Sequence, residues 1–323
     1  MKLVQMAPTA QTVIHQVLGV KPGEHVCILT DTDRPSTITQ VLGVMAKAAG
    51  AETVIVTMTP RLVGGQEPPK VAAAAVLASD VVICQASYAI VHTNTARDAL
   101  KRGARICEMW GFDEDMMIRG GAIGDYAEVQ RVSQALAELL TRGKEARLLT
   151  EAGTDLRVSL EGRQGHVLAG VANTPGSFCG FPDGEAAAAP KEGSAEGVLV
   201  NPFSIEKAEI AFPKGEVRIT VEKGRVVKVE GGTEATFLTR LIEELGESAR
   251  NLGEFAMGTN PACRLGVTLR ETKKCWGTAH VAIGDNKSLG GVVDSPIHMD
   301  MIFRDATVII DGQMVVAKGK VVV

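Results

Sequence analysis

The chain has 323 residues, of which 45% are hydrophobic, so it can bury one large core or two ordinary ones. Its formal net charge is only −4, and short basic runs such as Lys101-Arg102 and Lys273-Lys274 are interpreted as solvated surface. This balance argues against a nucleic-acid partner, because phosphate binding needs a concentrated basic face. The apolar runs are too short to cross a bilayer, so no membrane segment is expected.

The six cysteines are spread along the chain and contain no CxxC pair. Cys27, Cys84 and Cys107 fall in apolar runs, where we expect buried thiols that act as small hydrophobic side chains. The N-terminal residues do not resemble a secretory leader. Together these features predict a cytoplasmic protein whose thiols stay reduced.

The first half of the chain alternates strand-like with helix-like segments. Short, continuously apolar runs predict strands covered on both faces, at residues 24–31, 52–58, 80–86 and 105–110. Helices are expected between them, at residues 35–51, 70–79 and 94–104. Ser36 is the expected N-cap of the first of these helices and Gly50 its stop. Such β-α repeats predict a parallel sheet with helices on both sides.

A helix from about Tyr126 to Arg142 is expected to close this first domain, an α/β (Rossmann-like) unit over residues 1–147. The segment after the first strand, residues 30–35, has neither a GxGxxG nor a GxxxxGK[ST] motif. A parallel sheet without a phosphate loop says little about function, so we do not infer a nucleotide site.

From about residue 148 the pattern becomes antiparallel. Polar and apolar residues alternate over 155–167, and hairpins are expected to turn at Lys223-Gly224 and Asp311-Gly312. One amphipathic helix is predicted at about 234–250, and the Gly-, Pro- and Ala-rich segment 172–190 is expected to be loop. Residues 148–323 therefore form a predicted α+β domain with mainly antiparallel strands.

The residues with the clearest chemical potential lie in this second domain. His280 and His298 both lie in strand-like runs, and Asp300 follows at His-x-Asp spacing. Residues two apart in a strand share one face, so His298 and Asp300 should project together, about 7 Å apart along the backbone. Glu254, expected just after a helix that ends at Gly253, and Glu271 precede them in the sequence. Imidazole and carboxylate groups bind Zn²⁺, Mn²⁺, Co²⁺ or Fe²⁺, and this many donors favours a two-metal site.

The motifs around these residues are similar to those of a known family. LGEFAMGTNP (252–261), GTAHVAIGDN (277–286) and SPIHMDMIF (295–303) resemble, in this order, the metal-binding half of the aminopeptidase T/S (leucyl aminopeptidase) family. The likeness runs from about residue 176 to the end, whereas the first half is similar only in pattern. The resemblance implies a homodimeric metalloprotease with two divalent metals, Zn, Co or Mn, bound by Glu254, Glu271, His280, His298 and Asp300.

By this resemblance the protein would be a hydrolase that cleaves an amide or peptide bond in a small molecule or short peptide with a metal-activated water. The segment 179–200 resembles the part of the family that carries a further acidic residue, here Glu185, so Glu185 or Glu254 would be the general base. Lys287 stands where the peptidases usually have a tyrosine that stabilises the tetrahedral intermediate. A lysine could also stabilise an oxyanion, so Lys287 is a further catalytic candidate.

The 2,5-dihydroxypyridine 5,6-dioxygenases are a second, more distant resemblance, and they hold one Fe(II) with two histidines and a carboxylate. In that group the residue aligned with Glu254 is a histidine. Because this chain has Glu254 and keeps His280, the hydrolase is the leading hypothesis, although His280, His298 and Asp300 could alone form the iron triad. A non-catalytic binding protein with a vestigial site is the third hypothesis.

Overall fold

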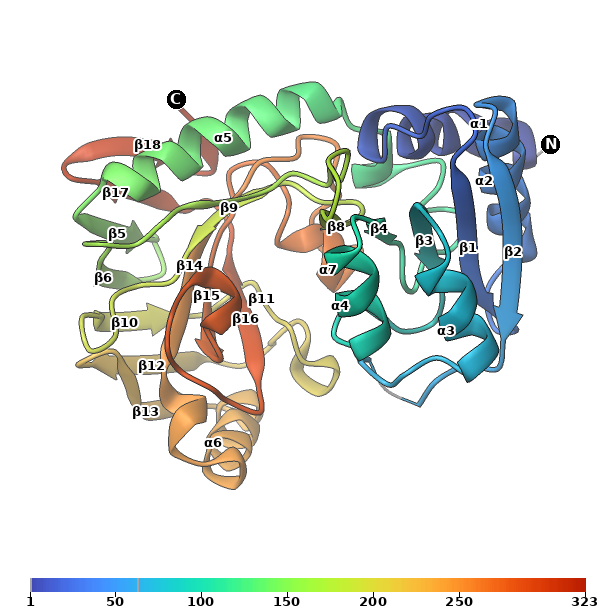
Figure 1. The fold of residues 1–323 in the computed structure, drawn as a ribbon. Helices are drawn as coiled ribbons and strands as arrows, with labels where there is room; N and C mark the ends of the chain where they lie inside the picture. The colour runs from blue at the N-terminus through green and yellow to red at the C-terminus, as the bar shows by residue number, and fades with distance from the viewer. Residues whose placement is uncertain (1, 63) are drawn as a thin grey trace. The chain divides into compact units, whose positions relative to one another are not determined.

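The computed structural model describes residues 2–62 and 64–323, which form two compact units (Figure 1). Unit 1 consists of Met1–Tyr126 and Ala169–Asp183, and unit 2 of Ala127–Leu168 and Gly184–Val323. Unit 1 has a parallel sheet with helices, and unit 2 has antiparallel sheets. The predicted fold class is therefore confirmed.

The five strands of unit 1 pair in the order β2-β1-β3-β4-β8, all in parallel. They are β1 (His25–Asp31), β2 (Glu52–Met58), β3 (Val81–Gln85), β4 (Arg105–Glu108) and β8 (Phe178–Gly180). One apolar cluster joins the sheet to α1 (Lys2–Thr12), the π-helical turn Val13–Val17 and α2 (Ser36–Ala48). A second cluster joins it to α3 (Lys70–Leu77) and α4 (Asn94–Lys101). The predicted parallel sheet with helices on both faces is thus present.

Details of unit 1 differ from the sequence-based expectations. The N-cap of α2 is Pro35, so Ser36 is the first helical residue and not the cap. Gly50 follows the end of α2, as predicted, and its φ is +86°, a backbone conformation that residues with a side chain rarely adopt. Strand β2 is the edge of the sheet and is partly exposed rather than covered on both faces. Helix α1 was not predicted.

The division into units does not follow the predicted boundary between residues 147 and 148. Helix α5 (Tyr126–Arg142) was expected to close unit 1, yet its residues Val132, Leu136 and Leu140 belong to the core of unit 2. Segment 169–183 returns to unit 1 because β8 pairs with β4. The expected loop at 172–190 was wrong, since it contains β8 and β9 (Glu185–Ala188). Sheet pairing overrides the low strand propensity of Gly and Ala there.

Unit 2 contains an eight-stranded and a six-stranded antiparallel sheet. The larger sheet consists of β13 (Arg225–Gly231), β12 (Val217–Glu222), β10 (Glu196–Val200), β6 (Asp155–Ser159), β5 (Glu145–Leu149), β17 (Thr307–Ile310), β18 (Gln313–Ala317) and β19 (Lys320–Val321). The smaller consists of β11 (Ser204–Ile205), β16 (His298–Phe303), β15 (Ala279–Gly284), β14 (Leu252–Gly258), β9 and β7 (His166–Leu168). Both predicted hairpin turns are present, with positive φ at Lys223-Gly224 and Asp311-Gly312.

The helices of unit 2 are α5, α6 (Thr233–Leu245) and the short α7 (Leu269–Thr272). The predicted helix at 234–250 is α6 followed by a 3-10 turn at Glu247–Arg250. Across residues 2–62 and 64–323, no helix is both long and apolar enough to cross a membrane.

Alternation along the strands gives the six-stranded sheet two different faces. Phe255, Val281, Met299 and Met301 belong to the large apolar core of unit 2, together with residues of the eight-stranded sheet and of α5 and α6. Neighbouring residues in these strands point to the opposite face because the side-chain period of a strand is two. That opposite face is free to carry polar groups.

Gly258, at the end of β14, allows the segment after α7 to lie directly against the sheet. A Cβ at this position would collide with the carbonyl oxygens of Cys275 and Lys273 and with the Thr278 hydroxyl. We expect Gly258→Ala to lower the free energy of unfolding by about 1–3 kcal/mol, measured by urea denaturation. Gly64→Ala is the control, because a Cβ there would meet no atom within 4 Å. Equal stability of the two variants would contradict this packing.

Candidate metal centre

Five of the ionisable side chains that the sequence predicted lie on one face of the six-stranded sheet. In the sheet register Ala282 of β15 lies between Glu254 of β14 and Asp300 of β16. His280 is two residues before Ala282, and His298 two before Asp300, so both histidines share this face. Glu185 of β9 pairs with Gly258 and joins the same face. Glu254 therefore lies inside a strand, and the prediction that it follows a helix was wrong.

Alanines fill the positions between these side chains. Ala187, Ala256 and Ala282 occupy the same face, and Ala256 pairs with both Ala187 and His280. All three are fully buried. A methyl group takes up little room, so neighbouring carboxylates and imidazoles can approach one another, while Leu289 and Leu168 pack against Ala187 and Ala256.

The side chains form two groups that share Glu254. In one group His280 Nε2 lies 3.2 Å from Glu185 Oε2 and 3.6 Å from Glu254 Oε1. In the other His298 Nε2 lies 2.8 Å from Glu254 Oε2 and 3.4 Å from Asp300 Oδ1. Within each group the potential ligand atoms lie within 4.8 Å of one another, so each could hold a metal ion.

A backbone carbonyl fixes the tautomer of His298. Its Nδ1 lies 2.7 Å from the carbonyl oxygen of Asp285, and because a carbonyl can only accept, Nδ1 carries the proton and donates it. Nε2 is then the atom that faces Glu254 and Asp300 and can present a lone pair to a metal. With about a third of its side chain exposed (32%), His298 is the most accessible of the five residues; His280 is fully buried.

The other donors are buried, and several of their atoms lack a hydrogen bond. In the part of the chain that the structure describes, no hydrogen-bond partner is found for His280 Nδ1 and Nε2, Glu185 Oε2 or Asp300 Oδ1. Buried polar atoms without partners are costly and call for an explanation. These atoms are imidazole nitrogens and carboxylate oxygens, which are the ligand types of divalent metals. All of them except His280 Nδ1 lie in one of the two groups that share Glu254, so the residues present fit a divalent metal.

Two lysines complete the cluster, and the sequence-based interpretation of Lys273-Lys274 as solvated surface was wrong. Lys274 Nζ lies 2.7 Å from Glu185 Oε1, and the side chain is 8% exposed. Lys273 Nζ lies 2.5 Å from Asp300 Oδ2 and 3.0 Å from Glu206 Oε2. Buried carboxylates need such partners. One local signal in the sequence indicates that these lysines are buried, the apolar pair Cys275-Trp276 that follows them. Sequence reasoning also missed Glu206, which lies far from the lysines in the sequence.

The structure does not bring Glu271 and Lys287 into this cluster. Glu271 is buried and pairs with Arg264, whose Nη2 lies 2.8 Å from Glu271 Oε1, and it belongs to neither of the two groups found among the described residues. Lys287 is exposed, and its Nζ lies 2.6 Å from Asp294 Oδ2. The resemblance to the peptidases implied a role for both residues in the site, but their charges are used in other ion pairs.

The charges of the cluster shift its pKa values in opposite directions. Burial would lower the pKa of His280, but Glu185, Glu254 and Asp300 raise it to about 9. Burial likewise opposes the charged form of His298, whose pKa Asp300 and Glu254 raise to about 11. Burial disfavours ionised Asp300, yet Lys273 and the two imidazoles hold its pKa well below the usual range. Both imidazoles are therefore protonated at neutral pH when no metal competes.

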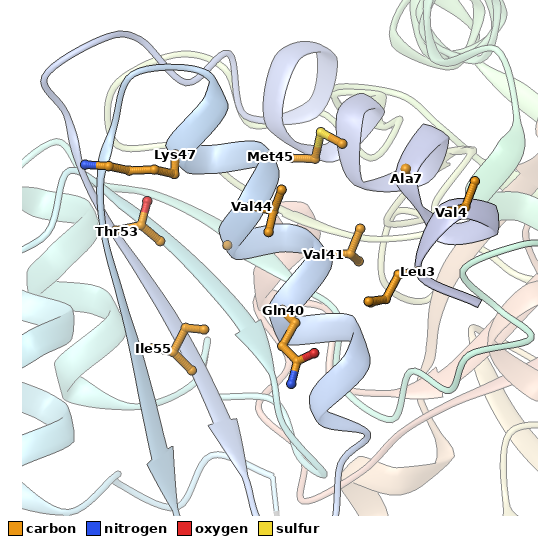
Figure 2. A pocket seen from close by; sticks show the side chains of 11 residues that line it. Leu3, Val4, Ala7, Gln40, Val41, Val44, Met45, Lys47, Thr53 and Ile55 are labelled. Atoms are coloured by element: carbon orange, nitrogen blue, oxygen red, sulfur yellow. The ribbon is translucent and has the colours of Figure 1, made fainter. Parts of the chain in front are cut away.

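An apolar groove in unit 1 is a separate feature (Figure 2). It is lined by α1, α2 and the edge strand β2, through residues such as Val4, Val41, Val44 and Ile55. Lys47 is the one ionisable residue among those that line it, so the groove offers no catalytic chemistry. Apolar surface of this kind suits a protein contact, but the homodimer expected from the sequence stays a prediction.

Comparison with known proteins identifies the family. Residues 9–323 match the family of NicX, the 2,5-dihydroxypyridine 5,6-dioxygenases. The chain belongs to this family. A relative in Pseudomonas putida KT2440, named 2,5-dihydroxypyridine 5,6-dioxygenase, is 25% identical over 203 residues. That alignment covers 58% of this chain and 57% of the relative, so it spans a little over half of the relative's length.

Two solved structures share the fold of this dioxygenase-family chain. The 2,5-dihydroxypyridine dioxygenase from Pseudomonas putida KT2440 superposes with a TM-score of 0.85 at 20% identity, over 99% of this chain and 97% of that one. Wild-type AmpT from Thermus thermophilus superposes with a TM-score of 0.71 at 18% identity, over 99% of both chains. At these identities the likeness concerns the fold alone.

These findings correct the function expected from the sequence. The hydrolase of the aminopeptidase T type, and with it the metalloprotease assignment, was wrong, because the family match and the curated relative both point to the dioxygenases. The alternative hypothesis is the better supported one.

The raised pKa values of the two histidines can be measured in metal-free protein. Following the imidazole signals of isotope-labelled histidine by NMR, we expect His280 to titrate at about 9 and His298 at about 11. Glu254→Gln should lower the pKa of both, because Glu254 is a carboxylate that both rings contact. Glu230→Gln, on the exposed strand β13, is the control. Wild-type values near the ordinary pKa of about 6.5 would contradict the geometry.

Proposed function

We propose that this protein is a metal-dependent dioxygenase that cleaves the ring of a hydroxylated pyridine or a related hydroxylated aromatic compound. The observation that carries the proposal is that the Nε2 atoms of His280 and His298 both approach the Glu254 carboxylate, at 3.6 and 2.8 Å, in a chain that belongs to the dioxygenase family. Two histidines and one carboxylate form the ligand set of non-haem Fe(II) oxygenases, which leaves positions open for O₂ and substrate.

The proposed metal is one Fe(II), held by His280, His298 and carboxylate oxygens of Asp300 and Glu254. In the dioxygenases that the sequence resembles, a histidine stands at the position of Glu254. The second imidazole in this chain would therefore come from His280, on the neighbouring strand. This single iron replaces the pair of Zn, Co or Mn ions that the peptidase resemblance implied.

When bound, the iron would activate O₂ for insertion of oxygen into the substrate ring. The chain's own residues prepare the site for this chemistry. The Asp285 carbonyl keeps the Nε2 lone pair of His298 directed at the cluster, and Lys273 holds Oδ2 of Asp300 while Oδ1 stays available. Because His298 is partly exposed, substrate and O₂ would approach from its side.

The first test is oxygen consumption by the full-length protein, purified without oxygen and loaded with Fe(II). With 2,5-dihydroxypyridine and a panel of dihydroxylated pyridines and benzenes, we expect O₂ uptake that a chelator abolishes and Fe(II) restores. His280→Ala and His298→Ala should each lose at least about 100-fold in kcat/KM, because each removes a ligand.

His92→Ala is the matched histidine control, since His92 lies on the exposed surface of unit 1. It should keep the wild-type rate. Failure of the iron-loaded wild type to consume O₂ with any compound of the panel would count decisively against the proposed reaction.

The pH dependence of metal binding gives an independent prediction. A metal binds the neutral imidazole, whereas the metal-free cluster holds protons on His280 up to about pH 9. Protons therefore compete with the metal below this pH, so the apparent affinity for Mn²⁺ should rise from pH 6 to pH 9. Calorimetry in buffers of different ionisation enthalpy should show proton release at pH 7. A binding constant that does not change with pH would refute the assignment of the two histidines as ligands.

A further inference from the structure

Lys274 stands inside the cluster in a position where a second metal would be expected. Its Nζ contacts Glu185 Oε1 at 2.7 Å, and Glu185 belongs to the group with Glu254 and His280 that could hold a metal ion. Both partners of this ion pair are buried, with 8% and 6% of their side chains exposed. A buried ammonium is kept only where a carboxylate compensates it, so this contact is a fixed part of the site.

The backbone around Lys274 holds the ammonium in place. The Lys274 amide donates to the carbonyl oxygen of Glu271 at 3.0 Å, and its own carbonyl oxygen accepts from Asn260 at 2.9 Å. The absence of a side chain at Gly258 lets the whole segment lie against β14. The lysine stem therefore starts from a rigid point beside the sheet, and its charge cannot readily move into solvent.

The net charge of the cluster matches one divalent cation. Glu185, Glu254, Asp300 and Glu206 contribute four negative charges, and Lys273 and Lys274 contribute two positive ones. Two negative charges remain, which one divalent ion with neutral imidazoles balances. A second divalent ion would leave two uncompensated positive charges in a largely buried site, where charge repulsion is strong.

We propose that Lys274 is a built-in cation that neutralises Glu185 and thereby limits the cluster to one divalent metal per chain. Glu185 then acts as the partner of Lys274, and the one metal is held by the other four residues, His280, His298, Asp300 and Glu254. The inference rests on the metal centre of the proposed function, but it does not depend on which reaction the metal supports.

Metal stoichiometry tests this inference without reference to activity. The metal-free full-length protein is saturated with Co²⁺, desalted and analysed for cobalt per chain, and the Co²⁺ absorption spectrum is followed during titration. We expect one equivalent in the wild type and two in Lys274→Met, because the uncovered Glu185 carboxylate then attracts a second cation. Lys228→Met, which removes an exposed lysine that pairs with Glu230, should bind one. Two equivalents in the wild type, or one in Lys274→Met, would overturn the proposal.

Lys274→Met leaves a buried carboxylate unpaired and could fail to fold, so the double variant Glu185→Gln/Lys274→Met provides a second test. Removing both charges of a buried pair is tolerated better than removing one. We expect the double variant to bind one Co²⁺ with a Kd within about threefold of the wild type, whereas removal of a ligand, or of a group that orients a ligand, would weaken binding by about tenfold or more. A loss of that size would show that Glu185 takes part in binding this metal and overturn the proposal.

The outcome is separable from that of the oxygen-consumption assay. One cobalt in the wild type and two in Lys274→Met, in a protein that consumes no O₂ with any substrate, would support this inference and refute the dioxygenase. Active enzyme whose cobalt count does not respond to Lys274→Met would refute the inference alone.

Discussion

The pairing register of the six-stranded antiparallel sheet decides which side chains meet in the cluster. The five ionisable side chains of the cluster come from four strands, yet all of them point to the same face of the sheet. They are Glu185, Glu254, His280, His298 and Asp300. A shift of one residue in any strand would move its donor into the apolar core and a core residue into the cluster. The large core on the opposite face therefore fixes the chemistry, because the cost of burying a charge there prevents such a shift.

The ion pairs of Lys273 and Lys274 are what make this arrangement tolerable. Several carboxylates that converge in a buried site repel one another, and each lysine removes one negative charge by binding one oxygen of a carboxylate. The remaining oxygens of Glu185 and Asp300 stay directed at the histidines. Two neighbouring residues in the sequence thus determine how much charge the cluster presents to a cation.

Much of this could be predicted from the sequence, and the failures have physical causes. Periodicity was enough to place His298 and Asp300 on one face, since a strand has only two faces. Periodicity could not show that Lys273 and Lys274 are buried. Two adjacent lysines are usually exposed, and the carboxylates that pair with these two lie far away in the sequence. Spacing also could not reveal that Glu271 would bind Arg264. The fold class was predictable from β-α repeats, whereas the strand containing Glu185 was hidden by its run of alanines.

Those alanines also set the thickness of the layer that covers this face of the sheet. Ala187 and Ala256 are fully buried and pack against Leu289 and Leu168. A larger side chain at either position would have to displace these leucines or the neighbouring ionisable side chains, because a packed interior has no room to spare. The spacing of the five ionisable groups therefore depends on the smallest side chain that a strand can carry without the conformational freedom of glycine.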